Sequence, residues 1–172
     1  MIGKVYKVQP QPPDPEHTTW LAAGALTIGV EYRQVDPAAL VATYAANAED
    51  MAEIEARSPE GGFYDEGVSL HVCGTDDGHE YLRFDVFADD PHYHYVHPGG
   101  DTNNVIEFDG AAHGDMLPWA LNCLRVRLPQ MLTEAGGGEL VGQVDQKVLD
   151  PTIEQVAELA QRAASRATEA SA

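Results

Sequence analysis

The stretch from residue 67 to residue 109 constrains the fold most, because apolar and polar residues alternate there through four short runs. The runs cover residues 67–73, 80–88, 92–97 and 104–109. They are separated by GTDDGH, DDP and PGGDTN, which are residue types that favour tight turns. Since short connections join antiparallel neighbours, the pattern predicts a four-stranded antiparallel meander.

Further elements are expected on both sides of the meander. Strands are predicted at residues 3–9, 25–35 and 139–149, and helices at 36–57, 115–135 and from 150 onwards. Residues 9–15 contain four prolines and should form a stiff connector, whereas residues 164–172 should fray. The order ββαββββαβα predicts an α+β fold, an antiparallel sheet with helices mainly on one face. The length of 172 residues indicates a single domain, 1–172.

The charge of the chain restricts its partners. There are 28 Asp and Glu residues against 10 Lys and Arg, which gives a net charge of −18 at pH 7. Such an acidic protein is not expected to bind nucleic acid or a membrane surface, since both require basic patches. The longest apolar run, Trp20–Val30, is about half the length of a membrane span. With only two cysteines, the chain fits a reducing compartment, and we expect a cytoplasmic protein whose partner is a small molecule.

The two faces of the predicted meander differ in character. The apolar face, expected to lie under the helices, carries Leu70, Val72, Leu82, Phe84, Val86, Tyr93, Tyr95, Ile106 and Phe108. The opposite face carries Ser69, His71, Cys73, Tyr81, Arg83, Asp85, Phe87, His92, His94, Val96, Val105, Glu107 and Asp109. Because histidines and carboxylates gather on this second face, it is where we expect function.

The histidines at alternate positions of one strand suggest a metal site. Turn lengths predict that Asp85 and Glu107 flank His94, and that Asp109 lies opposite His92. Two imidazoles that point the same way, with a carboxylate from a neighbouring strand, can bind one divalent first-row metal. The predicted ligands are His92, His94 and Glu107, with Asp109 or Asp85 as the alternative carboxylate. Fe, Mn, Zn and Cu are not distinguished, and no nucleotide-cofactor motif is present.

The same face also offers acid–base chemistry without a metal. His71, Arg83 and Asp85 are the predicted catalytic residues. In this interpretation Asp85 orients a histidine base, either His71 or His94, and Arg83 binds an anionic group or other part of a substrate. The predicted function is therefore a small soluble enzyme, with hydrolase, lyase and oxygenase chemistry left open.

A non-enzymatic alternative stays open as well. The histidine-rich face of the sheet could serve a subunit or a small-molecule-binding protein as an oligomer or partner interface, and homodimer formation is a further expectation. Two residues nearby are predicted to have ordinary structural roles. Cys73 should be a buried thiol rather than a nucleophile, and His113 a loop residue near a helix cap rather than an additional ligand.

Overall fold

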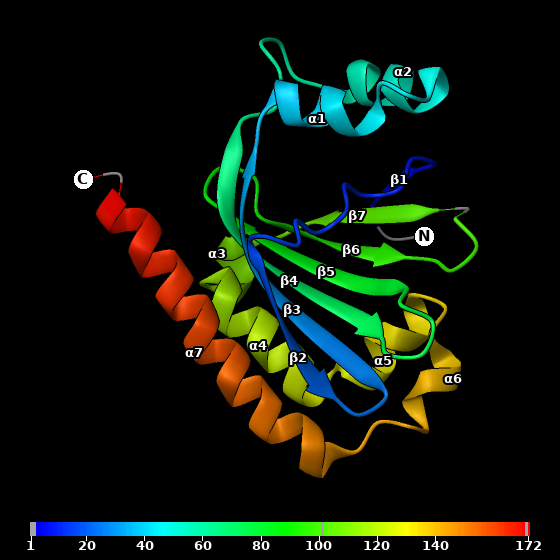
Figure 1. Cartoon of the computed structure of the whole chain (residues 1–172), viewed down its shortest axis with the longest axis vertical. Helices are drawn as coiled ribbons and strands as arrows, with labels where there is room; N and C mark the ends of the chain where they lie inside the picture. The colour runs from blue at the N-terminus through cyan, green and yellow to red at the C-terminus, as the bar shows by residue number, and fades with distance from the viewer. Residues whose placement is uncertain (1–2, 101, 171) are drawn as a thin grey trace.

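A seven-stranded antiparallel sheet forms the centre of the molecule in the computed structural model, which describes residues 3–100, 102–170 and 172. Across the sheet the strands follow the order β1 (Lys4–Tyr6), β7 (Asn103–Glu107), β6 (His92–Val96), β5 (Glu80–Phe87), β4 (Asp65–Gly74), β3 (Leu26–Val35) and β2 (Thr18–Ala23) (Figure 1). The four predicted runs are the consecutive neighbours β4 to β7. The predicted α+β class and the meander are therefore confirmed.

One face of the sheet is covered by the C-terminal half of the chain. The helices on it are α4 (Met116–Val126), α5 (Leu128–Glu134), α6 (Gly138–Val141) and α7 (Gln146–Ala170), and the short α3 (Gly110–His113) precedes them. Leu82, Phe84, Leu124 and Ile153 are completely buried in this layer. Burying each such side chain contributes about 1.5–3 kcal/mol. The predicted apolar face is thus confirmed as the main core.

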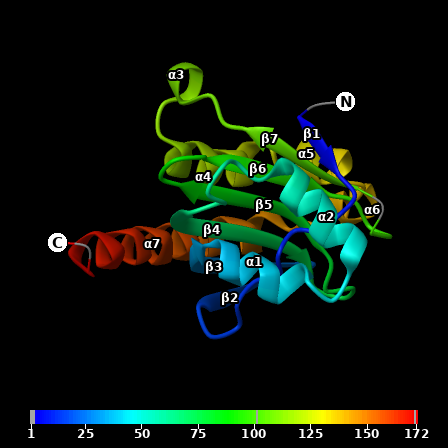
Figure 2. The same ribbon diagram turned by 90° about the horizontal axis from the view of Figure 1, so that it is seen from above.

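The opposite face is covered by the N-terminal part of the chain. Helices α1 (Pro37–Tyr44) and α2 (Ala48–Arg57) lie on this side (Figures 1 and 2). Residues 8–14, which we call the strap, follow β1 and precede β2. Because these two strands form opposite edges of the sheet, the segment that joins them crosses the whole face. The strap coincides with the predicted Pro-rich connector.

Several predicted elements differ from those observed. The strand β2 was not expected; it forms a hairpin with β3 across Gly24, whose φ of 67° requires glycine. The single helix predicted for 36–57 is two helices, because Asn47 caps a second one by accepting hydrogen bonds from Glu49 and Asp50. Arg127 likewise separates α4 from α5.

The largest error lies at residues 139–149, where α6, a short connection at residues 142–145 and the first turn of α7 take the place of the predicted strand. Leu140, Val141 and Val144 pack against the core at helical spacing, and Leu149 is buried in the first turns of α7. This helix continues to Ala170, through the segment expected to fray. None of the helices described has both the length and the apolar composition of a membrane span.

Candidate functional site

The polar face of the sheet is buried. Its side chains with relative exposures of 6% or less are Glu31, Arg33, Ser69, His71, Arg83, Asp85, His94 and Asn103. Charged groups removed from water require partners, and the strap supplies several of them. The carbonyl of Gln11 accepts hydrogen bonds from both Arg33 and Arg83, and that of Pro12 accepts one from Arg33. The face is therefore an interior layer with two groups of charges.

The first group, the His71 cluster, comprises Glu31, His71, Glu80 and Arg83. His71 Nδ1 lies 2.7 Å from Glu80 Oε1, and Nε2 lies 2.8 Å from Glu31 Oε2. Arg83 donates from Nε and Nη2 to the two Glu80 oxygens, at 2.7 Å each. Burial favours a raised pKa for Glu80, but the Arg83 charge and the hydrogen bonds from His71 and Arg83 together lower it. Both nitrogens of His71 are thus occupied by carboxylates.

Trp20 shields this cluster from the sheet edge. Its ring lies 6.0 Å from that of His71, and it passes over Gly29, the residue paired with His71 on β3. A Cβ atom at position 29 would lie 2.7 Å from the Trp20 ring. Glycine is therefore required here, since any side chain would displace the indole.

The second group is the triad of Asp85, His92 and His94. Asp85 Oδ2 lies 3.1 Å from His94 Nε2 and 3.3 Å from His92 Nε2. One ligand atom from each residue lies within 4.8 Å of the other two. Donor atoms bound at about 2.1 Å to one metal ion stand about 3.0–3.4 Å apart at right-angle or tetrahedral geometry. These separations match a site that binds a metal through two histidines and one carboxylate.

Strand pairing explains this convergence. Asp85 on β5 is paired with His92 on β6, and Arg83 is paired with His94. Alternate residues of a strand point to the same side, so the four side chains form a square on the polar face. Ser69 on β4, paired with Asp85, donates a hydrogen bond to its Oδ1 and leaves Oδ2 to the histidines.

The remaining ring nitrogens determine how the two imidazoles are protonated. His92 Nδ1 donates to the Asp90 carbonyl at 2.6 Å, because a carbonyl can only accept. His94 Nδ1 lies 2.8 Å from Asn103 Oδ1, while the Asn103 amide nitrogen donates to the Val8 carbonyl at 3.4 Å. With a hydrogen on each Nδ1, a ring that also carries an Nε2 hydrogen donates it to Asp85, and loss of that hydrogen on metal binding would leave an Nε2 lone pair directed at the same point. Metal-binding histidines are oriented in this way.

The charge states in the triad follow from burial and from Asp85. Burial lowers the pKa of His94, and Asp85 opposes this only in part, so the ring tends to be neutral. In His92, burial favours a lower pKa, but the hydrogen bond and charge of Asp85 outweigh it and the pKa is raised. Asp85 itself has a pKa well below its ordinary value, since hydrogen bonds from both histidines and the Arg83 charge overcome its burial. The carboxylate is therefore ionised, as a metal ligand must be.

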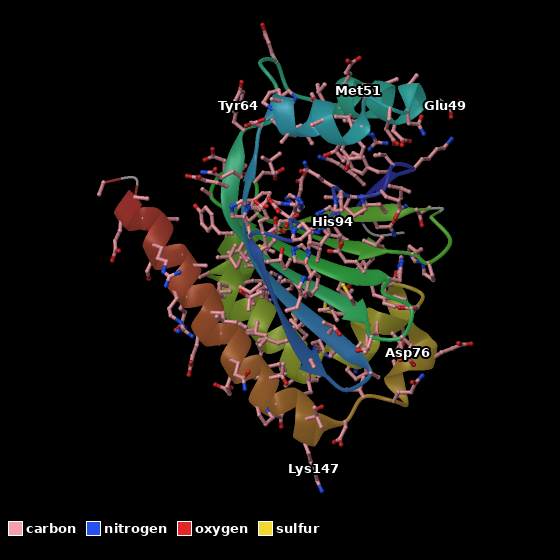
Figure 3. The ribbon with its side chains drawn as sticks, in the orientation of Figure 1. Glu49, Met51, Tyr64, Asp76, His94 and Lys147 are labelled. Carbon is pink, nitrogen blue, oxygen red and sulfur yellow. The ribbon has the colours of Figure 1, made fainter. Side chains whose placement is uncertain are left out.

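A cavity of about 390 Å³ opens above the triad. Arg83, Asp85, His92 and His94 line it on the sheet side. The apolar side chains that line it are Val8, Val35, Leu40, Ile54, Phe63, Phe87 and Val105. Figure 3 shows His94 inside the molecule, on the side of the sheet that faces α1. Tyr64 lies near the N-terminal end of that helix. A larger groove of about 710 Å³, between β3 and α7, includes none of the predicted site residues.

The predicted register was wrong by two residues. His92, not His94, is paired with Glu107, and Asp85 is paired with His92. Because the shift is even, every residue keeps its face, and Asp85 takes the carboxylate position expected for Glu107. Glu107 instead is largely exposed and forms an ion pair with Lys4. Asp109, the other alternative, caps α3.

The predicted catalytic residues are divided between the two groups. Asp85 and Arg83 border the cavity. His71 does not line it, because it lies in the His71 cluster with a carboxylate partner at each ring nitrogen. The cluster includes Glu80 because of a β-bulge between β4 and β5: Cys73 is paired with Glu80, and Val72 with Leu82. Tyr81 therefore joins the core, although alternation had predicted it on the polar face.

Other residues of the face were missed. Glu31 and Arg33 occupy alternate positions of β3, a period-two signal inside a run read as wholly buried. Asn103 lies at a strand end, where sequence gave no indication of its contact with His94. His113 packs against the rings of Phe108 and Trp119, away from the triad.

The thiol predicted to be structural is buried on β4. Burial raises the pKa of the Cys73 thiol to about 12, and the nearby Glu80 charge adds to the effect. A thiol in this state is a poor nucleophile, because the thiolate is the reactive form.

Comparison with known families assigns the chain to one of them. Residues 20–160 match the family described as "Domain of unknown function (DUF7700)", and the chain belongs to this family. The match includes the triad, whereas the strap lies before its first residue. Searches of curated proteins and of solved structures give no match.

Proposed function

We propose that the protein is a metal-dependent enzyme that acts on a small molecule bound between the polar face and α1. The observation that carries the proposal is the convergence of two Nε2 atoms and one carboxylate oxygen at the base of a cavity. In each histidine the other ring nitrogen is already hydrogen-bonded to a fixed acceptor. Three donor atoms from one side leave the remaining coordination positions open towards the cavity.

An ion in this site would act as a Lewis acid or activate a bound water molecule. Hydrolase, lyase and oxygenase chemistry all use such a site, and the donor set fits Zn as well as Fe or Mn. Arg83, beside His94, would bind or orient the substrate. This proposal keeps His92 and His94 as ligands and replaces Glu107 with Asp85.

A metal-free acid–base site is the second candidate. It is supported by the contact of 3.1 Å between Asp85 Oδ2 and His94 Nε2, a carboxylate–imidazole pair that can exchange a proton beside the cavity. The non-enzymatic alternative, a subunit or small-molecule-binding protein, stays a prediction; the chain's own strap and helices cover much of the face that it would use as an interface. Homodimer formation by other surfaces stays a prediction.

Metal titration separates these candidates. Purified apo-protein is titrated calorimetrically with Zn²⁺ and Mn²⁺, and bound metal is counted by elemental analysis. We expect about one tightly bound ion in the wild type and at least a 100-fold loss of affinity when both imidazoles of the triad are removed, since three donors are reduced to one. His113→Ala is the matched control, because His113 is exposed and distant from the triad.

The variant with His92→Ala and His94→Ala must be shown to fold by circular dichroism before it is titrated. Equal metal content in the wild type, this variant and His113→Ala would overturn the metal site. It would leave the acid–base candidate, for which activity would persist in the presence of a chelator.

A further inference from the structure

Two hydrogen-bond donors beside the triad lack partners. Arg83 uses Nε and Nη2 for Glu80 and for the strap, and no hydrogen bond from its Nη1 is found within residues 3–100, 102–170 and 172. The side-chain nitrogen of Gln9 is buried and has no partner among the same residues. Both residues line the cavity. A buried donor without a partner, such as the Gln9 nitrogen, is rare in proteins and marks a place for a ligand acceptor, and Arg83 Nη1 offers a second donor in the same cavity.

The course of the strap puts Gln9 near the triad. Val8 accepts a hydrogen bond from Asn103 on β7, and Gln11 accepts one from Arg83 on β5. Between these two anchor points the strap crosses β6, the strand that carries His94. Gln9 is fixed there through its own carbonyl, which accepts a hydrogen bond of 2.8 Å from the Tyr44 hydroxyl. Among the residues that the structure describes, the Gln9 side-chain nitrogen has no hydrogen-bond partner, so it is available to a ligand.

We infer that the cavity binds a small monocarboxylate with an apolar or aromatic body, its carboxylate received by Arg83 Nη1 and Gln9 Nε2 beside the triad. The inference deepens the proposed function and rests on it. A guanidinium and an amide are the donors that proteins use for carboxylates. The apolar walls, which include Leu40, Ile54 and Phe63, suit the body of such a ligand.

The charges of the site agree with a single negative charge on the ligand. Arg83 is paired with Glu80, and Arg33 lies 3.5 Å from Glu31, so both arginines have acidic partners. A divalent ion bound by one carboxylate and two neutral imidazoles retains one positive charge. A monoanion compensates that charge, whereas a neutral ligand does not.

The acidic surface does not prevent this binding. Asp89 and Asp90 are exposed to solvent at the rim of the cavity. The Asp90 carboxylate lies 4.0 Å from His92 Nδ1, whereas exposed acids more than about 8 Å from the ligand are largely screened at physiological ionic strength. The third acid of the rim, Asp65, is engaged with three backbone N–H groups of residues 88–90. Local donors thus outweigh the negative charge of the whole protein.

The test uses the full chain loaded with Co²⁺, whose visible spectrum reports both metal binding and a change of ligands. Co²⁺ is titrated first, without any organic ligand. Benzoate and benzamide are then titrated into the loaded protein; they have nearly the same size and differ in charge. Acetate and phenylacetate extend the series of carboxylates. We expect benzoate to bind at least tenfold more tightly than benzamide.

Gln9→Glu is the decisive variant, because it replaces the unpartnered donor with a carboxylate of the same shape. We expect it to bind Co²⁺ as the wild type does and to lose at least tenfold in benzoate affinity. Gln9→Leu should lose less, since it removes the donor without adding charge. Gln143→Glu adds the same charge at an exposed position and should change neither affinity.

The outcomes separate the two proposals. If Co²⁺ does not bind, or binds equally after removal of His92 and His94, the proposed function fails. If Co²⁺ binds at the triad and no carboxylate binds more tightly than benzamide, the ligand inference alone is overturned. It is also overturned if Gln9→Glu and Gln143→Glu bind benzoate with the same affinity.

Discussion

His71 and His94 lie on the same face of the same sheet, and both are almost completely buried. Each ring nitrogen of His71 meets a different carboxylate, so both nitrogens have a partner within the protein. His94 shares a single carboxylate oxygen with His92, and its second nitrogen is occupied by an amide. The first arrangement is complete within the protein. The second gathers electron-rich atoms that an added cation would stabilise.

The difference shows how burial and charge alone fail to identify a site. Perturbed pKa values occur in both groups, as expected when charges are buried. What separates the groups is the count of donors against acceptors, and the cavity, which all three residues of the triad line and which only Arg83 of the His71 cluster reaches. Four measurements test this difference between the two groups.

Loss of His71 should have the largest effect on stability. His71→Leu leaves the carboxylates of Glu31 and Glu80 without their shared partner, and we expect the free energy of unfolding to fall by about 3–5 kcal/mol. Denaturant titration monitored by circular dichroism measures this. The folded fraction should still bind metal with wild-type affinity. A loss of metal affinity as great as that of the variant with His92→Ala and His94→Ala would show that the two groups are not separate.

Glu80 should make stability depend on pH in the acid range. Its pKa is lowered in the folded protein from an ordinary value of 4.5, so its stabilisation is complete above about pH 5 and is lost as the pH falls below that value. Glu80→Gln should reduce stability by about 1.5–3 kcal/mol at pH 7. The difference from the wild type should shrink between pH 5 and pH 3. Thermal unfolding at several pH values checks this, and a constant difference would contradict it.

Asn103 should affect metal affinity through His94. Removing the acceptor of the His94 Nδ1 hydrogen in Asn103→Leu should weaken metal binding by about 10–100-fold, the usual effect of losing such a partner. The same titration on Asn104→Leu, the adjacent residue of β7 that points to the helices, serves as control. Unchanged affinity in Asn103→Leu would mean that the ring is oriented without it.

Glu107 should have the smallest effect. Its side chain is directed to Lys4 at the surface, so Glu107→Gln should alter metal affinity less than about twofold. Calorimetric titration measures the change. A loss as large as that for Asp85→Asn would restore the ligand set predicted from the sequence.

Sequence periodicity was sufficient to predict both faces of the meander except at Glu80 and Tyr81, the first residues of β5. It placed Leu70 and Phe84 under the helices and His94 and Asp85 on the opposite side, because the side-chain period of a strand is two. It could not predict the register of β5 and β6. The carboxylate of Asp65 accepts hydrogen bonds from the backbone of residues 88–90 and shapes a wider turn than local residues indicate.

The sequence also gave no indication that the strap covers the polar face of the sheet. Nothing local connects Gln11 with Arg83, which lie 72 positions apart and meet through a backbone carbonyl. Glu80 was missed for a different reason. The extra residue at Tyr81 reverses the alternation of side chains at the start of β5, and no residue type signals such a bulge.

The attachment of the strap has a consequence for how molecules exchange with the interior. Lifting residues 8–14 would remove the backbone carbonyl acceptors that Gln11 and Pro12 provide to two buried guanidinium groups, so this segment is unsuited to open and close during turnover. Substrate and product would instead enter and leave at the rim of the cavity, where Tyr64 and Asp89 are exposed. The size of molecule admitted would then be set by the side chains of that rim, and the rate of entry would be insensitive to residues 8–14.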